Sequence, residues 1–172
     1  MVIKDYIIEK HKEAEGTLFF KSIIERKMPN QVWYNFLFNK MLILSCLEEK
    51  IEYIEGLSRV AKLRDDLLSS RLQNLQIKKT TFSYIDYLRN LNNDFLFAHV
   101  YVWYMGDLNG GKMIKKIIEA QHTNLEFEDS ETLKKLILDK VDINMIDEIN
   151  VCFDWVTKLL KEFDKELLQE SN

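Results

Sequence analysis

Apolar residues recur at intervals of three and four along almost the whole chain, a spacing that places them on one face of an α-helix. Between residues 31 and 53, for example, Trp33, Phe36, Leu44 and Leu47 supply such a face. The pattern predicts an all-α protein of six to eight helices without a sheet. The expected helices cover residues 2–15, 18–26, 31–53, 59–75, 80–91, 93–120, 130–141 and 145–168, and the helix over 93–120 is expected to be interrupted at residues 106–111.

Residues with strong local preferences separate these segments. Gly16 and Gly56 are expected to end helices, and Pro29, which is the only proline, resets the chain before the long third segment. Thr80 and Ser130 are candidates to cap the helices that follow them.

The length of 172 residues suits one domain, because about 150 residues per domain is usual and no linker-like stretch divides the chain. Residues 1–172 are therefore expected to form a single domain, and 47% hydrophobic residues supply its core. The net charge of −4, with basic and acidic residues intermixed, argues against a nucleic-acid partner.

The cysteines and the apolar runs of the chain indicate the cellular compartment in which the protein is expected. Cys46 and Cys152 lie far apart with no CxxC pair, so both are expected to be free thiols in a reducing environment. The N-terminus carries charges where a signal peptide needs an apolar core. The longest nearly apolar run, residues 95–105, is shorter than the ~20 residues that a spanning helix needs. We expect a cytoplasmic protein with no membrane anchor.

Three of the five glycines, Gly106, Gly110 and Gly111, fall within one six-residue stretch. Glycine inside a helix costs about 1 kcal/mol relative to alanine, so the cluster gives up about 3 kcal/mol of helix stability. Absent side chains let the backbone approach a large planar ligand closely. The sequence therefore predicts a kinked helix that lies against such a ligand, with Asp107 as a polar group beside it.

A hairpin is the alternative for this stretch. Asn109 and Gly110 form a favoured two-residue turn, and residues 100–104 before them have strand propensity. Apolar residues on both sides nevertheless continue at helical spacing, which favours the helix.

His11 is the most informative of the three histidines. Glu15 lies one helical turn onward, where its carboxylate can accept the Nδ1 proton and leave Nε2 free for a metal. Lys4 lies two turns back on the same face, placed to meet an anionic group of the ligand. Spacing alone also allows His11 to be an ordinary boundary residue. His99 and His122 are expected to have structural roles.

Three segments together resemble the haem oxygenase family in order and separation: residues 11–15, 46–52 and 98–112. The resemblance spans most of the chain and is weaker over residues 57–92 and 121–142. It implies an all-α fold in which haem lies between a proximal helix that holds His11 and a distal helix kinked at residues 106–111.

The resemblance also implies roles for individual residues. His11 would be the axial ligand of the haem iron. Asp107, with Gly106 and Gly110, would form the catalytic face, where Asp107 orders waters that protonate the iron-bound peroxide. Gly111 would continue the backbone surface against the macrocycle. An imidazole donates less electron density to the iron than a thiolate does. The polarity of the distal side of the site then decides which oxidation chemistry follows.

Further haem contacts follow from the same resemblance. Lys4 and Lys134 would pair with the propionates, with Tyr101 nearby, and Phe153 would pack against the macrocycle. Exposed ion pairs are individually weak, so these lysines would orient haem more than they bind it.

The chain departs from the family pattern at three positions. Trp103 stands where many relatives have arginine, Asn109 where serine is common, and Leu138 where some have a second propionate-binding arginine. These departures bear on the orientation of haem, and hence on which carbon is cleaved.

The implied reaction uses haem, O2 and a reductant to produce biliverdin, most readily the IXα isomer, with free iron and carbon monoxide. Haem would be both substrate and cofactor, the electron donor would be soluble, such as a ferredoxin, and the protein would act as a monomer. Two alternatives remain open: a non-catalytic haem-binding or haem-sensing protein on the same scaffold, and a helical enzyme that acts on an organic substrate without haem.

Overall fold

The computed structural model describes residues 3–170, and within that range every regular element is a helix. The α-helices are α1 (Lys4–Glu15), α2 (Leu18–Ile24), α3 (Asn30–Lys50), α4 (Val60–Ser70), α5 (Lys79–Asn90), α6 (Leu96–Ile117), α7 (Ser130–Lys140), α8 (Ile146–Lys161) and α9 (Asp164–Glu170). Short 3-10 helices precede α6 (η1, Asn93–Phe95), follow it (η2, Thr123–Leu125) and precede α8 (η3, Ile143–Met145). The predicted all-α fold is confirmed.

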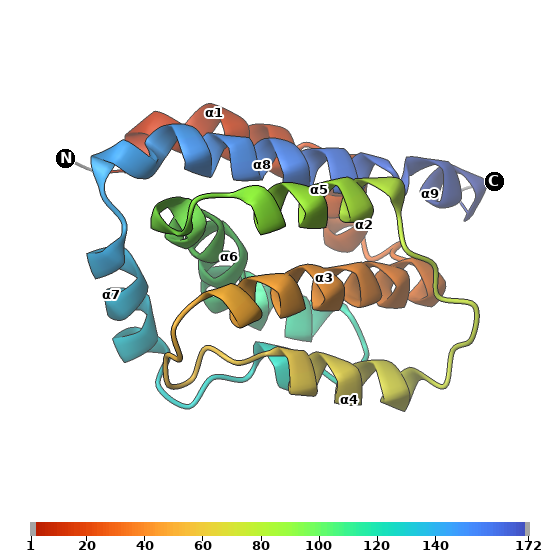
Figure 1. Cartoon of the computed structure of the whole chain (residues 1–172). Coiled ribbons are helices and arrows are strands. Elements are labelled where there is room, and N and C mark those ends of the chain that lie inside the picture. Colours follow the sequence, from red (N-terminus) through yellow and green to blue (C-terminus); the bar gives the residue numbers. More distant parts are fainter. Residues whose placement is uncertain (1–2, 171–172) are drawn as a thin grey trace.

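Figure 1 shows how the helices are arranged across the molecule. α1 and α8 lie side by side along one edge, and α4 lies along the opposite edge. α3 packs against both α4 and α5, and α5 in turn contacts α8. α6 crosses behind these helices and packs against α7 and α8. This arrangement brings α1, near the start of the chain, close to the interior that α3 and α6 border.

The last predicted helix is wrong in one respect, because residues 145–168 form two α-helices rather than one. At the end of α8 the amides of Glu162 and Phe163 donate to carbonyls three residues back, at 3.1 and 3.2 Å, instead of four. This tightening ends the helix and directs Phe163 into the core, where its ring lies 5.7 Å from that of Phe19.

Several predicted helix ends also differ, because tertiary contacts set them. α3 ends at Lys50, and Gly56, at φ +85°, lies in the turn beyond. The amide of Thr80 lies inside α5 and donates to Oε1 of Glu162, so the cap comes from the turn between α8 and α9. The side chain that caps α7 is Asp129, which accepts from the amide of Thr132, rather than Ser130.

Residues 71–78 leave the helical pattern that the sequence predicted to continue to residue 75. Arg71 takes a left-handed conformation (φ 55°) and ends α4. Asn35 Oδ1 then accepts from the amide of Gln76 at 2.7 Å, and Asn39 Oδ1 accepts from the amide of Lys78 at 2.8 Å. Side chains of α3 thus satisfy the backbone of this segment in place of helical hydrogen bonds.

His99 lies at the centre of a buried polar network that connects α5, α6 and α8. Its Nδ1 is 2.6 Å from Tyr84 Oη and its Nε2 is 2.8 Å from Glu148 Oε1. Trp103 Nε1 donates to Tyr84 Oη at 3.0 Å, and Cys152 Sγ lies 3.2 Å from the same oxygen. The structural role expected for His99 is confirmed.

His122 and the two cysteines also have the structural states that the sequence predicts. His122 is buried, with Nε2 2.7 Å from the carbonyl oxygen of Ile118. Cys46 and Cys152 are both buried free thiols, as predicted, and burial raises the pKa of each. Within residues 3–170, no helix combines the length and apolar character needed to cross a bilayer.

Candidate active site

A cavity of about 640 Å³ opens between α1, α2, α3, α6 and α8, with η2 at one end. Its volume falls within the range of about 300–1,000 Å³ that is usual for small-molecule and cofactor sites. Its walls are mainly apolar, with a small number of polar groups on α1, α3, α6 and η2. The predicted proximal and distal residues, His11 and Asp107, both line it.

The α1 wall carries His11, Glu15 and Lys4. Nδ1 of His11 lies 3.1 Å from Oε1 of Glu15, one turn away, so the predicted pairing is present. Within the described residues, Nε2 of His11 has no hydrogen-bond partner, and the side chain is 52% exposed. Phe153 of α8 holds the ring edge-on, with the centroids 5.6 Å apart. The imidazole is therefore oriented by one nitrogen and open at the other.

The glycine cluster lies on α6, which forms another wall of the cavity. Here the prediction of an interruption is wrong, because α6 remains helical from Leu96 to Ile117, which also rules out the hairpin. A Cβ added at Gly106 or Gly110 would meet no other atom within 4 Å, and both residues line the cavity. Gly111 is not in the lining; a Cβ there would lie 3.5 Å from Leu125 of η2. Two of the three glycines thus present bare backbone to the cavity.

Asp107 is held by a residue that the sequence did not single out. Nζ of Lys40, on α3, lies 2.8 Å from Oδ1 and 2.7 Å from Oδ2 of Asp107. The Lys40 side chain is 4% exposed and that of Asp107 is 14% exposed. One signal could have revealed Lys40, because it lies on the apolar face of the third segment, four residues after Phe36 and four before Leu44.

Two buried polar atoms of the lining have no hydrogen-bond partner within the described residues: Nε1 of Trp33 and Oδ1 of Asn124. A buried polar group without a partner is costly, so each indicates a ligand or water in the cavity. Together with bare helical backbone, apolar walls and one open imidazole nitrogen, these groups fit a large planar ligand that carries a metal.

The other predicted contacts divide into two groups. Tyr101 and Phe153 line the cavity, and burial raises the pKa of Tyr101. Lys134 is not in the lining; it lies on α7, where its Nζ is 3.5 Å from Oε1 of Glu131. Trp103 does line the cavity, although its indole N–H is engaged by Tyr84.

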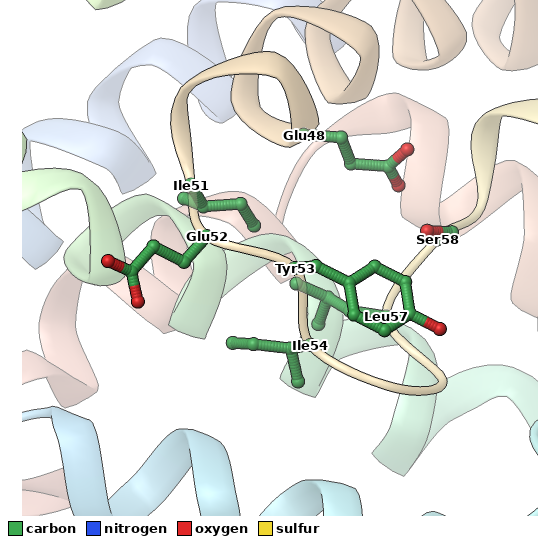
Figure 2. Close-up of a pocket in the computed structure, with 7 residues that line it drawn as sticks. All are labelled: Glu48, Ile51, Glu52, Tyr53, Ile54, Leu57 and Ser58. Atoms are coloured by element: carbon green, nitrogen blue, oxygen red, sulfur yellow. The ribbon is translucent and has the colours of Figure 1, made fainter.

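A second, smaller pocket of about 150 Å³ lies where the chain leaves α3 (Figure 2). Figure 2 shows Tyr53, Ile54 and Leu57 along the loop that encloses it. Glu48 accepts from the amide of Arg59 at 2.7 Å and from Tyr104 Oη at 2.8 Å, so its carboxylate holds the loop and α6 in place. Because the carboxylate of Glu48 is used to hold the structure together, we take the larger cavity as the candidate active site.

Comparison with known families agrees with this geometry. The family model described as Heme oxygenase matches residues 3–140, which is most of the chain. The chain belongs to the haem oxygenase family.

Individual relatives extend the match over nearly the full length. A protein of Rhodella violacea named Heme oxygenase is 25% identical, over 92% of this chain and 84% of its own. Heme oxygenase 1 of a Nostoc species is 24% identical, over 92% and 83%.

Solved structures share the fold. Heme oxygenase-1 from the cyanobacterium Synechocystis, crystallised in complex with heme, has a TM-score of 0.86 at 22% identity, over 97% of this chain and 92% of that one. Heme oxygenase from Leptospira interrogans has a TM-score of 0.81 at 21% identity, over 93% and 97%.

Proposed function

We propose that this protein is a haem oxygenase that uses O2 and a reductant to convert haem to biliverdin, free iron and carbon monoxide. The observation that carries the proposal is that one cavity is lined both by an imidazole with an open nitrogen, His11, and by a helix with bare backbone and a carboxylate, Asp107. Bound haem would supply the iron at which O2 is activated, and would itself be the molecule oxidised.

His11 is the proposed iron ligand. Its contact with Glu15 favours the tautomer that has the proton on Nδ1 and the lone pair on Nε2. Phe153, edge-on to the ring, limits its rotation. Glu15 and Phe153 therefore orient the imidazole and leave Nε2 available as a donor to iron.

The α6 wall is proposed to set where haem is attacked. With no side chain at Gly106 or Gly110, the helix backbone can lie close to one face of the macrocycle and exclude ligand from most of its rim. Cleavage at the α-meso carbon, which gives biliverdin IXα, is the expected outcome. Asp107 is the proposed distal group, and its carboxylate would hold water and pass protons on that side.

The haem edge is proposed to contact Lys4, Tyr101 and Phe153, all of which line the cavity. Lys4 would meet a propionate. Gly111 and Lys134 have weaker support, because neither belongs to the lining. We further propose a soluble one-electron donor such as a ferredoxin, and action as a monomer in the cytoplasm.

A non-catalytic haem binder is the second candidate, and one observation favours it. Both oxygens of Asp107 already lie within 2.8 Å of Lys40 Nζ, which leaves less of the carboxylate free for water. A binder of this kind would form a stable haem complex that does not change when reductant is added.

One absorption series separates the candidates. Haemin is added to the purified protein, followed by ferredoxin, its reductase and NADPH in air. A Soret band that decays into the broad red absorbance of biliverdin is expected. A Soret band that persists after reduction would support the binder, and a protein that develops no Soret band would overturn both.

A further inference from the structure

We propose that Lys40 is a positioning residue of the active site, which fixes the Asp107 carboxylate against α3. The inference deepens the proposed function and rests on it, because it concerns the proton path on the Asp107 side of the cavity.

The first argument is burial. A lysine ammonium that is only 4% exposed loses most of its hydration, which costs several kcal/mol unless a counter-charge replaces the water. Asp107 is the one acidic group of the described residues that contacts Nζ of Lys40, and it does so with both oxygens. The two charges therefore require one another, and their pairing specifies a single position for the carboxylate.

The second argument is the rigidity of the support. Lys40 extends from the middle of α3, where its neighbours Leu37 and Leu44 are fully buried in the core. Asp107 lies on another helix, α6, 67 residues away in sequence. A carboxylate on the cavity wall is thus held from outside its own helix, so rotation of its side chain would break the ion pair.

The third argument is unused hydrogen-bonding capacity. An ammonium has three N–H donors, and the carboxylate of Asp107 engages at most two of them. Lys40 also lines the cavity, so a water there can meet a donor from Lys40 and an acceptor from Asp107. The pair is equipped to order a water as well as to neutralise its own charges.

Among residues 3–170, the other titratable groups of this region make no contact with Asp107. Arg59, just before α4, feels the Asp107 charge, although burial leaves the pKa of Arg59 lowered overall. Tyr104, one turn back on α6, donates to Glu48. His11 and Glu15 line the cavity from α1. Removal of Lys40 would leave Asp107 without an adjacent cation to fix its carboxylate.

A haem-free experiment tests this directly. Infrared difference spectra at pH 7 follow the antisymmetric stretch of the Asp107 carboxylate, which is identified by its loss in Asp107→Asn. In Lys40→Met this band is expected to shift and broaden relative to the parent, because the carboxylate loses the ammonium that fixes it. Lys40→Arg, which keeps the charge, should stay near the parent, and Lys115→Met, on the exposed end of α6, should match it.

The same variants are then assayed with haem. If Lys40 positions the Asp107 carboxylate, Lys40→Met should slow bilin formation about tenfold, and Lys40→Arg should restore most of the rate. The double variant Lys40→Met/Asp107→Asn removes both charges and shows whether the fold survives without the pair.

The outcomes separate the inference from the proposed function. An Asp107 carboxylate band that is unchanged in Lys40→Met would overturn the role of Lys40, whatever the turnover. A parent protein that binds haem and makes no bilin would overturn the proposed function, while the infrared spectra would still decide whether Lys40 positions Asp107.

Discussion

His11 and His99 are both histidines on amphipathic helices, yet they have opposite surroundings. The side chain of His99 is fully buried, and both of its nitrogens have partners, Tyr84 and Glu148. The side chain of His11 is 52% exposed, and only Nδ1 has a partner. A ring whose hydrogen bonds are complete can stabilise a fold, but it has no lone pair left to bind a metal. A ring oriented by one bond and open at the other nitrogen is prepared for a ligand.

Replacement of His11 by alanine should have the largest effect. The imidazole–iron signature in the absorption and electron paramagnetic resonance spectra of the haem complex should be lost, with turnover, because no other nitrogen of the α1 wall is suited to bind iron. Added imidazole should restore the signature. The urea midpoint of the haem-free protein should hardly change, since the side chain is exposed. A haem complex of this variant with the same spectrum as the parent would show that His11 is not the iron ligand.

His99→Ala should show the converse behaviour. Loss of a fully buried ring removes one hydrogen bond from Tyr84 Oη and one from Glu148 and leaves a void, so the free energy of unfolding should fall by about 3 kcal/mol. Urea denaturation measures this change. The haem spectrum of the variant that remains folded should keep the parent's ligand signature, and a changed axial ligand would show that His99 is not purely structural.

Glu15→Ala tests the orientation of His11 rather than its presence. Loss of the carboxylate should weaken haem affinity by about 10–100-fold, the usual effect of removing a group that orients a metal-binding histidine. Titration with haemin gives the affinity, and Glu13→Ala, on the same helix but outside the lining, is the matched control. Equal affinities in both variants would mean that Glu15 does not orient the ring.

Glu148 gives the His99 network a pH dependence. Burial by itself would raise the pKa of Glu148, but hydrogen bonds from His99 and Tyr87 outweigh burial and lower it below the ordinary value of 4.5. The stabilisation is therefore fully present above about pH 4.5 and is lost as the pH falls through the lowered value. Urea midpoints between pH 3 and pH 7 should fall on the acid side more steeply for the parent than for Glu148→Gln. Parallel curves would contradict this assignment.

Replacement of Lys4 or Lys134 should have the smallest effects on haem binding. Lys4→Ala should weaken haem binding by at most about fivefold, the value of an exposed ion pair. Lys134→Ala should change it less, because Lys134 lies outside the cavity lining. Haemin titrations at low and high salt compare the two, and a larger effect for Lys134 would favour the propionate contact that the family resemblance implies.

The sequence predicted the helices well, because their periodic apolar faces are a local property. It missed several helix ends because their partners are distant: Glu162 caps α5, and Asn35 and Asn39 hold the segment after α4. In the site, the His11 and Asp107 motifs were found from short spacings. Lys40 was missed because a lysine within a helix is usually solvated, and its partner is remote in sequence.

The unbroken course of α6 has a further consequence for its register. His99 and Asp107 are eight residues apart on this single helix, about 12 Å along its axis. One residue inserted between them would turn Asp107 by about 100° around the axis relative to the anchored His99. The carboxylate would then leave both Lys40 and the cavity while the core stayed intact. The spacing of these two side chains is therefore as much a requirement of the site as their identities.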